Sequence, residues 1–179
     1  SKGGLSSRAL ASTPTLFHVT NTPRSSYLLI PRHSTETRPY IPLGFMRPED
    51  LSGDANLISE EATLFHFGVM HSRMHMAWVR SVCGRIKSDY RYSASIVYNN
   101  FPWPDLSDQE QEESVISAAE GVLSSRARFA DSTLSDLYDP LTMPPELYRA
   151  HKALDKAVDA LYIAAEQAAG RKPPKLGSD

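Results

Sequence analysis

The chain has 179 residues, 41% of them hydrophobic and 22% charged, and its formal net charge is −2. This composition is close to the average of globular domains and excludes disordered and collagen-like chains. The apolar runs fall short of the about 20 residues that cross a bilayer, and the single cysteine, Cys83, excludes an internal disulfide framework. We therefore expect a cytoplasmic protein without a membrane span, and the missing initiator Met indicates an excised fragment.

The charge is divided unevenly along the chain. Residues 1–105 carry 11 Lys or Arg against 8 Asp or Glu, whereas residues 106–179 carry 8 against 13. Between positions 73 and 91 a single acid, Asp89, stands among five basic residues: Arg73, Arg80, Arg85, Lys87 and Arg91. This pattern predicts a local basic patch on a nearly neutral protein.

The first half of the chain predicts an α+β unit over residues 13–105. Residues 1–12, rich in Ser and Gly, predict a flexible lead-in. Ser59, followed by two acids, predicts the start of a helix that runs to Val82, either unbroken or divided at His71–Ser72. Short segments bordered by Pro predict strands before this helix, at residues 16–19, 27–30, 40–45 and 56–58. A further strand is predicted after the helix, at residues 92–98. Residues 99–104 then end regular structure.

The second half predicts a helical segment over residues 106–169. Ser107 and Glu110 form a capping box ahead of an apolar stripe over residues 115–127, and a second stripe covers residues 147–165. The connector between them predicts an antiparallel helical pair, and residues 170–179 predict a disordered tail. The fold class is therefore α+β, with a small, mostly antiparallel or mixed sheet, packed helices and a C-terminal helical pair.

The motifs of common catalytic sites are missing from the sequence. It contains no glycine-rich phosphate loop, GxGxxG, CxxC or HExxH motif. His71 and His75 have the i, i+4 spacing of metal ligands, but without a third ligand we expect them to pack or to meet a phosphate. Cys83 follows the predicted helix, where the dipole disfavours a thiolate, so we expect a small core residue. We therefore predict no catalytic residue, bound cofactor or metal in this chain.

The segment from Gly84 to Ser93 is the most informative in the chain. If it is extended, Arg85, Lys87, Asp89 and Arg91 project from one face and the residues between them from the other. Lys donates to guanine O6 and N7 and Asp accepts from cytosine N4, so Lys87 and Asp89 could contact the two halves of one G·C pair. The alternative is a solvated edge strand in which these two residues form a surface ion pair of little consequence.

Several segments also resemble the target-recognition domain of MmeI-like proteins, which are type II restriction-modification enzymes and related adenine-specific DNA methyltransferases. The resemblance covers roughly residues 13–166 and includes His151 and Asp155. Its motifs, in the family's order, are residues 31–45 (PRHSTETRPYIPLGF), 67–80 (FGVMHSRMHMAWVR), 84–93 (GRIKSDYRYS), 96–104 (IVYNNFPWP) and 137–147 (LYDPLTMPPEL).

The resemblance implies the later part of a recognition domain, followed by the family's helical C-terminal segment. In such proteins an S-adenosylmethionine-dependent methyltransferase domain comes first, and some members also carry a nuclease domain. The positions of Lys87 and Asp89 vary there as a charged pair in step with one base pair, Lys with Asp going with guanine. The position of Arg91 is likewise implicated in base choice.

These observations predict a sequence-specific duplex DNA recognition module without chemistry of its own, which presents the target adenine to the methyltransferase domain. Lys87, Asp89 and Arg91 are the predicted base-contacting residues. The predicted phosphate or loop residues are Arg32, Glu36, Arg38, Arg73, Arg80 and Arg85, with a mutual Glu36–Arg38 pair as the alternative for the loop. The rival prediction is a protein-interaction scaffold that docks the catalytic domain and contacts no base.

Overall fold

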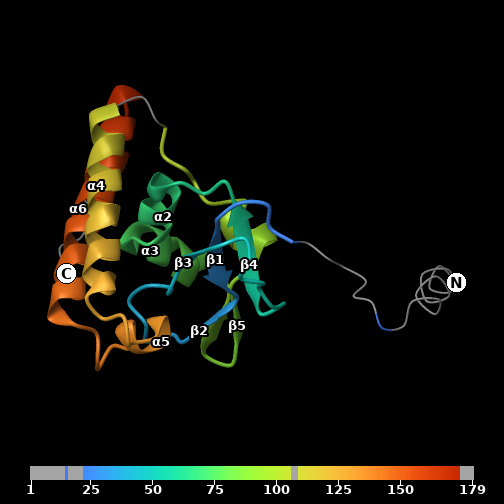
Figure 1. Cartoon of the computed structure of the whole chain (residues 1–179). Helices are drawn as coiled ribbons and strands as arrows, with labels where there is room; N and C mark the ends of the chain where they lie inside the picture. The colour runs from blue at the N-terminus through green and yellow to red at the C-terminus, as the bar shows by residue number, and fades with distance from the viewer. Residues whose placement is uncertain (1–14, 16–21, 106–108, 174–179) are drawn as a thin grey trace, which may run out of the picture.

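A computed structural model describes residue 15 and residues 22–105 and 109–173 (Figure 1). The predicted lead-in, the predicted strand at residues 16–19 and Ser107 of the predicted capping box lie outside the described residues, as does most of the predicted tail. No helix in the described ranges is long and apolar enough to cross a membrane.

The first sheet has three antiparallel strands in the order β3-β1-β4, namely β3 (Gly44–Met46), β1 (Tyr27–Pro31) and β4 (Asn56–Glu60). Its centre is β1, whose Tyr27, Leu28 and Ile30 are buried. The predicted helix start at Ser59 is wrong, because Ser59 lies in β4 opposite Leu28. Pairing along the whole of β1 outweighs the local capping signal there.

The second sheet is smaller, and its strands are also antiparallel. Its order is β2-β6-β5, with β2 (His33–Ser34), β6 (Asp89–Arg91) and β5 (Gly84–Ile86). The chain passes directly from β1 of the first sheet into β2 of the second, and the backbone N–H of Tyr92 donates to the Arg32 carbonyl at this junction, at 2.7 Å. The second sheet is therefore attached to the first through the end of its central strand, β1.

Two short helices lie between β4 and β5 in sequence and divide at the predicted His71–Ser72 boundary. Helix α2 (Leu64–Met70) starts at Thr63, whose hydroxyl and backbone form a capping box with His66. Helix α3 (Arg73–Val82) starts at Ser72, whose hydroxyl accepts from the His75 backbone N–H. Each start therefore satisfies a free helical N–H with a side-chain oxygen.

The predicted strand over residues 92–98 is wrong, because Ala94–Tyr98 forms one turn of π-helix, η1. Val97 is buried, and its carbonyl accepts a hydrogen bond from Trp78 Nε1 at 3.0 Å. The indole of Trp78 in α3 thus provides the hydrogen-bond donor for this buried carbonyl, which in a strand would come from a neighbouring strand.

The C-terminal helices form the predicted antiparallel pair. Helix α4 (Gln109–Ala127) and helix α6 (Pro145–Ala168) run side by side in opposite directions, and the short helix α5 (Leu134–Leu137) lies in their connection (Figure 1). Helix α2 packs closely against α4 at Gly68, where an added Cβ would lie 2.9 Å from Val115. A glycine is needed for this close approach.

One hydrophobic core spans both halves of the chain. It joins Leu28 of the first sheet and Phe67 of α2 to Val115 of α4 and Leu154 of α6. The predicted fold class, α+β with a mostly antiparallel sheet and a helical pair, is confirmed. The predicted domain division near residue 105 stays a prediction, and the core crosses it without a break.

Candidate nucleic-acid interface

Strands β5 and β6 form a hairpin whose two-residue turn is Lys87–Ser88. The strands pair with Ile86 opposite Asp89 and Arg85 opposite Tyr90. The backbone of Lys87 has φ 57°, which lies in the left-handed region that residues other than glycine rarely adopt. Lys87 is also exposed, so the hairpin holds a long cationic side chain in solvent at a position where glycine would be less strained.

The turn changes the predicted arrangement of the charged residues. Residues directly opposite each other in an antiparallel pair share a face, so Asp89 and Arg91 share one face whereas Arg85 lies on the other with Tyr90. The prediction that four charges project from one face of an extended segment is therefore wrong. Arg85 instead lies 4.3 Å from the Tyr90 ring and donates to the Ser88 carbonyl at 2.7 Å.

The solvent-exposed face of the second sheet carries four side chains. Asp89 and Arg91 come from β6, Ile86 lies opposite Asp89, and His33 lies opposite Arg91. All four are exposed, whereas Ser34 and Tyr90 on the other face are buried. We call His33, Ile86, Asp89 and Arg91 the exposed sheet face.

Sequence reasoning missed His33 and Ile86 as members of this face. His33 is 58 positions away from Arg91, so its place depends on strand pairing that local patterns do not reveal. Ile86 lies on the face of Asp89 only because the turn has two residues, and the sequence Lys87–Ser88 carries no glycine that would signal such a turn.

The loop after β2 contacts the hairpin and connects it to the C-terminal helices. The Glu36 backbone N–H donates to Asp89 Oδ1 at 3.4 Å, and the Glu36 carboxylate lies 3.6 Å from Arg85 Nη1. Arg38 donates to the Ser135 hydroxyl of α5 at 2.8 Å. The alternative of a mutual Glu36–Arg38 pair is therefore wrong, since each residue has another partner.

Three further predicted residues lie in different environments. Arg73 at the start of α3 is half-buried; its Nε lies 3.5 Å from the buried Asp155, and its backbone N–H donates to Asp155 Oδ1 at 2.8 Å. Arg32 is half-buried, and its Nε donates to the Asn56 carbonyl at 3.3 Å. Arg80, in the last turn of α3, is exposed. Their contact with phosphate stays a prediction.

The two histidines with metal-ligand spacing have separate surroundings. His71 ends α2 and lies 3.0 Å from Arg126 Nη2, while His75 in α3 lies 3.0 Å from the Tyr92 hydroxyl. Burial lowers the pKa of His71 well below its usual value and lowers that of His75 to about 3. Within the part of the chain that the structure describes, no group of three or more acidic, His or Cys side chains could hold a metal ion.

Cys83 caps the C-terminal end of α3 and is half-buried against the core. Desolvation raises the pKa of its thiol. A raised pKa leaves little thiolate near neutral pH, which suits a packing role.

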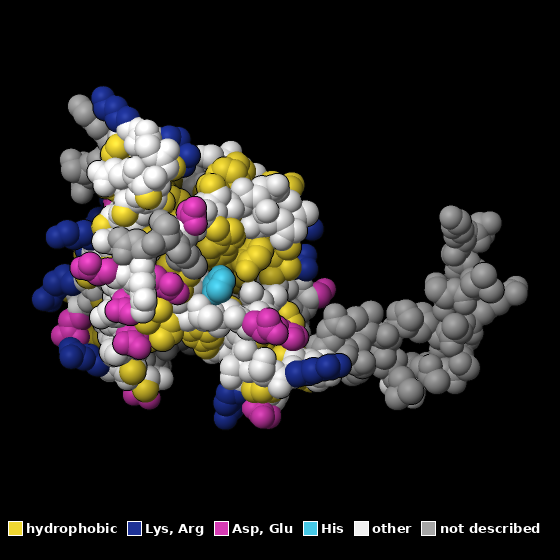
Figure 2. Space-filling model, turned by 90° about the horizontal axis from the view of Figure 1, so that it is seen from above, with side chains coloured by type: hydrophobic (Ala, Val, Ile, Leu, Met, Phe, Trp, Pro, Cys, Tyr) yellow, Lys and Arg dark blue, Asp and Glu magenta, His cyan; other side chains and the backbone are white. Residues whose placement is uncertain are grey.

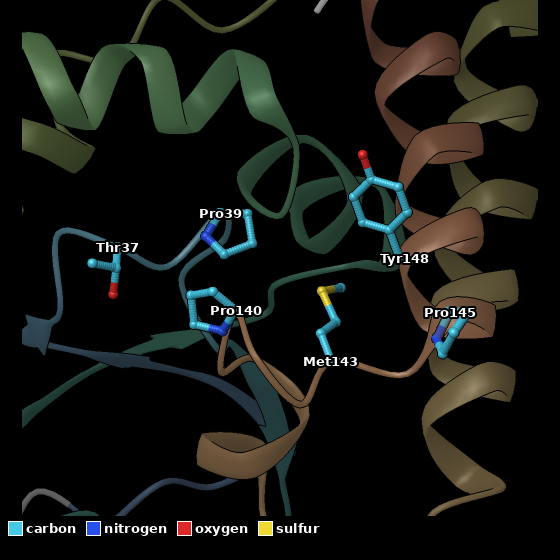
Figure 3. A pocket seen from close by; sticks show the side chains of 6 residues that line it. All are labelled: Thr37, Pro39, Pro140, Met143, Pro145 and Tyr148. Carbon is cyan, nitrogen blue, oxygen red and sulfur yellow. The ribbon is translucent and has the colours of Figure 1, made fainter.

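A groove of about 410 Å³ lies where the loop after β2 meets the C-terminal helices (Figure 3). Thr37 and Pro39 line one side, and the other side consists of residues from the connector and α6, namely Pro140, Met143, Pro145 and Tyr148. The lining is apolar apart from two hydroxyl groups, so it offers packing surface and no acid or base.

The end of the molecule remote from the hairpin tip is different in character. Figure 2 shows that end, with apolar side chains gathered between the helical pair and the rest of the molecule and charged ones mostly around the rim. The hairpin and α5 lie at the other end, as the labels in Figure 1 show. The charged groups of the hairpin and the loop after β2 therefore belong to one end of the protein.

The chain belongs to the MmeI family, because two models of that family together match residues 2–105 and 107–171. Residues 2–105 match the model of the MmeI target recognition domain, and residues 107–171 match that of the MmeI C-terminal domain. The resemblance noted in the sequence is thereby confirmed.

Two particular relatives are similar over most of the chain. DNA methyltransferase A of Bacillus subtilis (strain 168) is 39% identical over 153 residues, which are 86% of this chain and 17% of that protein. The type IIL restriction-modification enzyme MmeI, whose structure was solved in complex with DNA, is 43% identical, with a TM-score of 0.83 over 94% of this chain and 22% of MmeI. The chain therefore spans about a fifth of the length of these relatives.

Proposed function

We propose that this chain recognises a specific sequence in duplex DNA on behalf of a longer bacterial, cytoplasmic, adenine-specific DNA methyltransferase. The chain itself carries no catalytic residue, and the methyltransferase domain, with its S-adenosylmethionine, lies outside these 179 residues. Whether that enzyme also cuts DNA does not affect the role of this part. The relatives named above, a DNA methyltransferase and a restriction-modification enzyme solved with DNA, support the proposal.

The observation that carries the proposal is the exposed, charged hairpin. A major groove admits a two-stranded β-ribbon, and its base edges present donors and acceptors that differ for each base pair. Lys87, at the tip, supplies a donor for guanine O6 and N7, and Asp89, two residues on, supplies an acceptor for cytosine N4. Arg91 lies on the same face as Asp89, which supports its assignment to a neighbouring base.

The loop after β2 and the basic residues around the hairpin have supporting roles in this proposal. Arg80 contacts phosphate, as does Arg32 where its guanidinium is still accessible, and such contacts set the position of a protein on DNA without selecting a sequence. Glu36 and Arg85 connect the loop to the hairpin, and Arg38 connects the loop to α5. Arg73 stabilises the protein by pairing with the buried Asp155, and we assign it no DNA contact.

The proposal is tested by exchanging the two charges in the full-length enzyme. The methylated adenines of a genome that carries the gene first give the target sequence. Lys87→Glu combined with Asp89→Arg should then change the preferred base at one position of that target, because a wrong base pair costs about 1–3 kcal/mol of binding free energy. Methylation with an unchanged target preference in the double variant would reject the assignment of these residues.

A second candidate function, docking of another protein domain, is favoured by the apolar groove between Thr37 and Tyr148 and by Leu141 beside it, which is 94% exposed. Salt separates the two functions. Binding to phosphates weakens steeply with ionic strength: the logarithm of the affinity falls against the logarithm of the salt concentration with a slope of about −0.9 per contacted phosphate. Fluorescence anisotropy of labelled duplexes across a salt series would reveal that slope for a DNA-recognition module and no measurable binding for a pure scaffold.

A further inference from the structure

Ile86 is an apolar side chain left in solvent among charged ones. It is 44% exposed, precedes Lys87 at the turn and lies directly opposite Asp89. It does not belong to the hydrophobic core or to the partly buried side chains packed against it. Ile86 therefore presents a branched apolar side chain to solvent beside Lys87 and Asp89, where it is accessible to an apolar group of a bound ligand.

We propose that Ile86 is a specificity-determining residue that contacts the C5-methyl group of a thymine in the major groove. The inference rests on the proposed function, in which the same hairpin contacts base edges. In that groove thymine presents a methyl group beside its acceptor, and apolar side chains select it.

The geometry of the hairpin limits which thymine this can be. Side chains opposite each other across an antiparallel pair have Cβ atoms about 5 Å apart, and successive base pairs are about 3.4 Å apart along the duplex. When Asp89 contacts cytosine N4, Ile86 therefore lies over the same or the next base pair. The thymine should be adjacent to the G·C pair that Lys87 and Asp89 contact.

The surroundings of Ile86 favour DNA over a protein domain as its partner. Lys87 and Arg91 flank the position with positive charge, and Asp89 is the only acid on the exposed sheet face. A protein surface that covered this face would have to bury or pair each of these charges, whereas base edges and phosphates provide partners for them.

The test removes the methyl group from the DNA and the side chain from the protein in turn. Each thymine in and beside the mapped target is replaced by deoxyuridine, which lacks only the methyl group, and the affinity of the full-length enzyme is measured. We expect about a fourfold loss at one thymine adjacent to the pair contacted by Lys87 and Asp89, a factor typical of one buried methyl group. Ile86→Ala should bind the thymine duplex about as weakly as the unchanged enzyme binds the deoxyuridine duplex, and should be insensitive to the replacement.

Two further variants keep the result interpretable. Ile86→Val should retain most of the sensitivity, because it keeps a branched side chain at the same place. Ile96→Ala, which truncates a similarly exposed isoleucine on η1 (51% exposed), should leave the sensitivity unchanged. Urea denaturation of each variant reports directly whether the fold is intact.

The outcome separates this inference from the proposed function. Equal sensitivity to deoxyuridine in the unchanged enzyme and in Ile86→Ala, or no sensitive thymine at all, would overturn the role of Ile86 while site-specific methylation persists. If the unchanged enzyme bound no duplex in a sequence-specific way, the proposed function itself would be refuted. A sensitive thymine distant from the G·C pair also overturns the inference, because the hairpin cannot reach it.

Discussion

Arg126 and Arg91 show how burial assigns different roles to the same side chain. Arg91 lies on an exposed strand at the surface of the second sheet. Arg126 is 8% exposed at the end of α4 and donates to the Tyr138 hydroxyl and to the Leu43 carbonyl, each at 2.7 Å, with His71 at 3.0 Å. The guanidinium of Arg91 is exposed and accessible to a ligand, whereas that of Arg126 is hydrogen-bonded within the fold.

The cluster around Arg126 joins the two halves of the chain. His71 and Tyr40 come from the recognition half, and Tyr138 and His151 from the helical half, with stacked rings between Tyr40 and His151 and between His71 and Tyr138. Asp155 extends the cluster by accepting from the Tyr40 hydroxyl at 2.7 Å. Because these groups are buried and hydrogen-bonded across the two halves of the chain, the helical pair holds the loop after β2 at Tyr40 and the end of α2 at His71.

Removal of Arg126 should have the largest effect on stability. Arg126→Ala leaves a cavity and deprives two buried acceptors, the Tyr138 hydroxyl and the Leu43 carbonyl, of their donor. We expect the free energy of unfolding to fall by about 3–5 kcal/mol, as for other buried polar clusters that lose one member. Urea denaturation followed by circular dichroism measures this change.

The matched control is Arg91→Ala, which removes the same side chain from the exposed sheet face. Exposed substitutions away from the core usually change stability by less than about 0.5 kcal/mol. If both variants unfolded at the same urea concentration as the unchanged protein, the contrast between junction and hairpin would be refuted.

Acid should destabilise the fold through its buried histidines. Burial lowers the pKa of both His75 and His151 from 6.5 to about 3 in the folded protein. The unfolded chain therefore binds protons that the folded protein excludes, so their contribution is fully present above pH 6.5 and is lost as the pH falls toward 3. At pH 5 each histidine should cost about 2 kcal/mol of stability.

Urea midpoints between pH 7.5 and 4.5 measure the acid effect. In His151→Gln the dependence should become shallower by about one proton, although the variant is less stable throughout. His33→Asn, at an exposed site, should retain the full dependence of the unchanged protein. A flat profile for the unchanged protein would contradict the burial of neutral histidines.

The sequence predicted the elements that local patterns specify and missed those that depend on pairing. The helical pair follows from two apolar stripes and a proline-rich connector, and α2 and α3 divide at the expected Ser72. Ser59 has the pattern of a helix cap but pairs with Leu28 in the first sheet. The segment over residues 94–98 alternates as a strand does, yet it pairs with no strand among the described residues and forms a turn whose Val97 carbonyl accepts a hydrogen bond from Trp78.

The charged residues of the candidate site were named from the sequence, whereas its geometry, and with it His33 and Ile86, was missed. Lys87, Asp89 and Arg91 follow from residue type and from the resemblance, and all three are exposed. The turn between β5 and β6 could not be inferred, because Lys-Ser is not a typical two-residue turn and no glycine marks it. Arg73 was assigned by charge alone, and its partner Asp155 lies 82 residues away in sequence.

The strain at the hairpin tip gives a smaller and opposite prediction. Lys87→Gly should raise the free energy of unfolding by up to about 1 kcal/mol, because glycine adopts φ 57° without a steric cost. The same variant should lose preference for the base at that position, since the donor is gone. Lys87→Ala is the control: it removes the donor and keeps the strain, so it should lose the preference without any gain in stability.

Arg80 and Arg73 extend the comparison to two arginines within a single helix, and the expected effect is the smallest. Arg80→Ala should weaken binding of all duplexes about equally and reduce the slope of log affinity against log salt by about 0.9, the value of one phosphate contact, with no change in stability. Arg73→Ala should instead lower stability, because it leaves Asp155 without its cation in the interior, and should leave the salt slope unchanged. A reduced slope in Arg73→Ala with an unchanged slope in Arg80→Ala would reverse the assignment, because it would place the phosphate backbone at the start of α3 and not at its end.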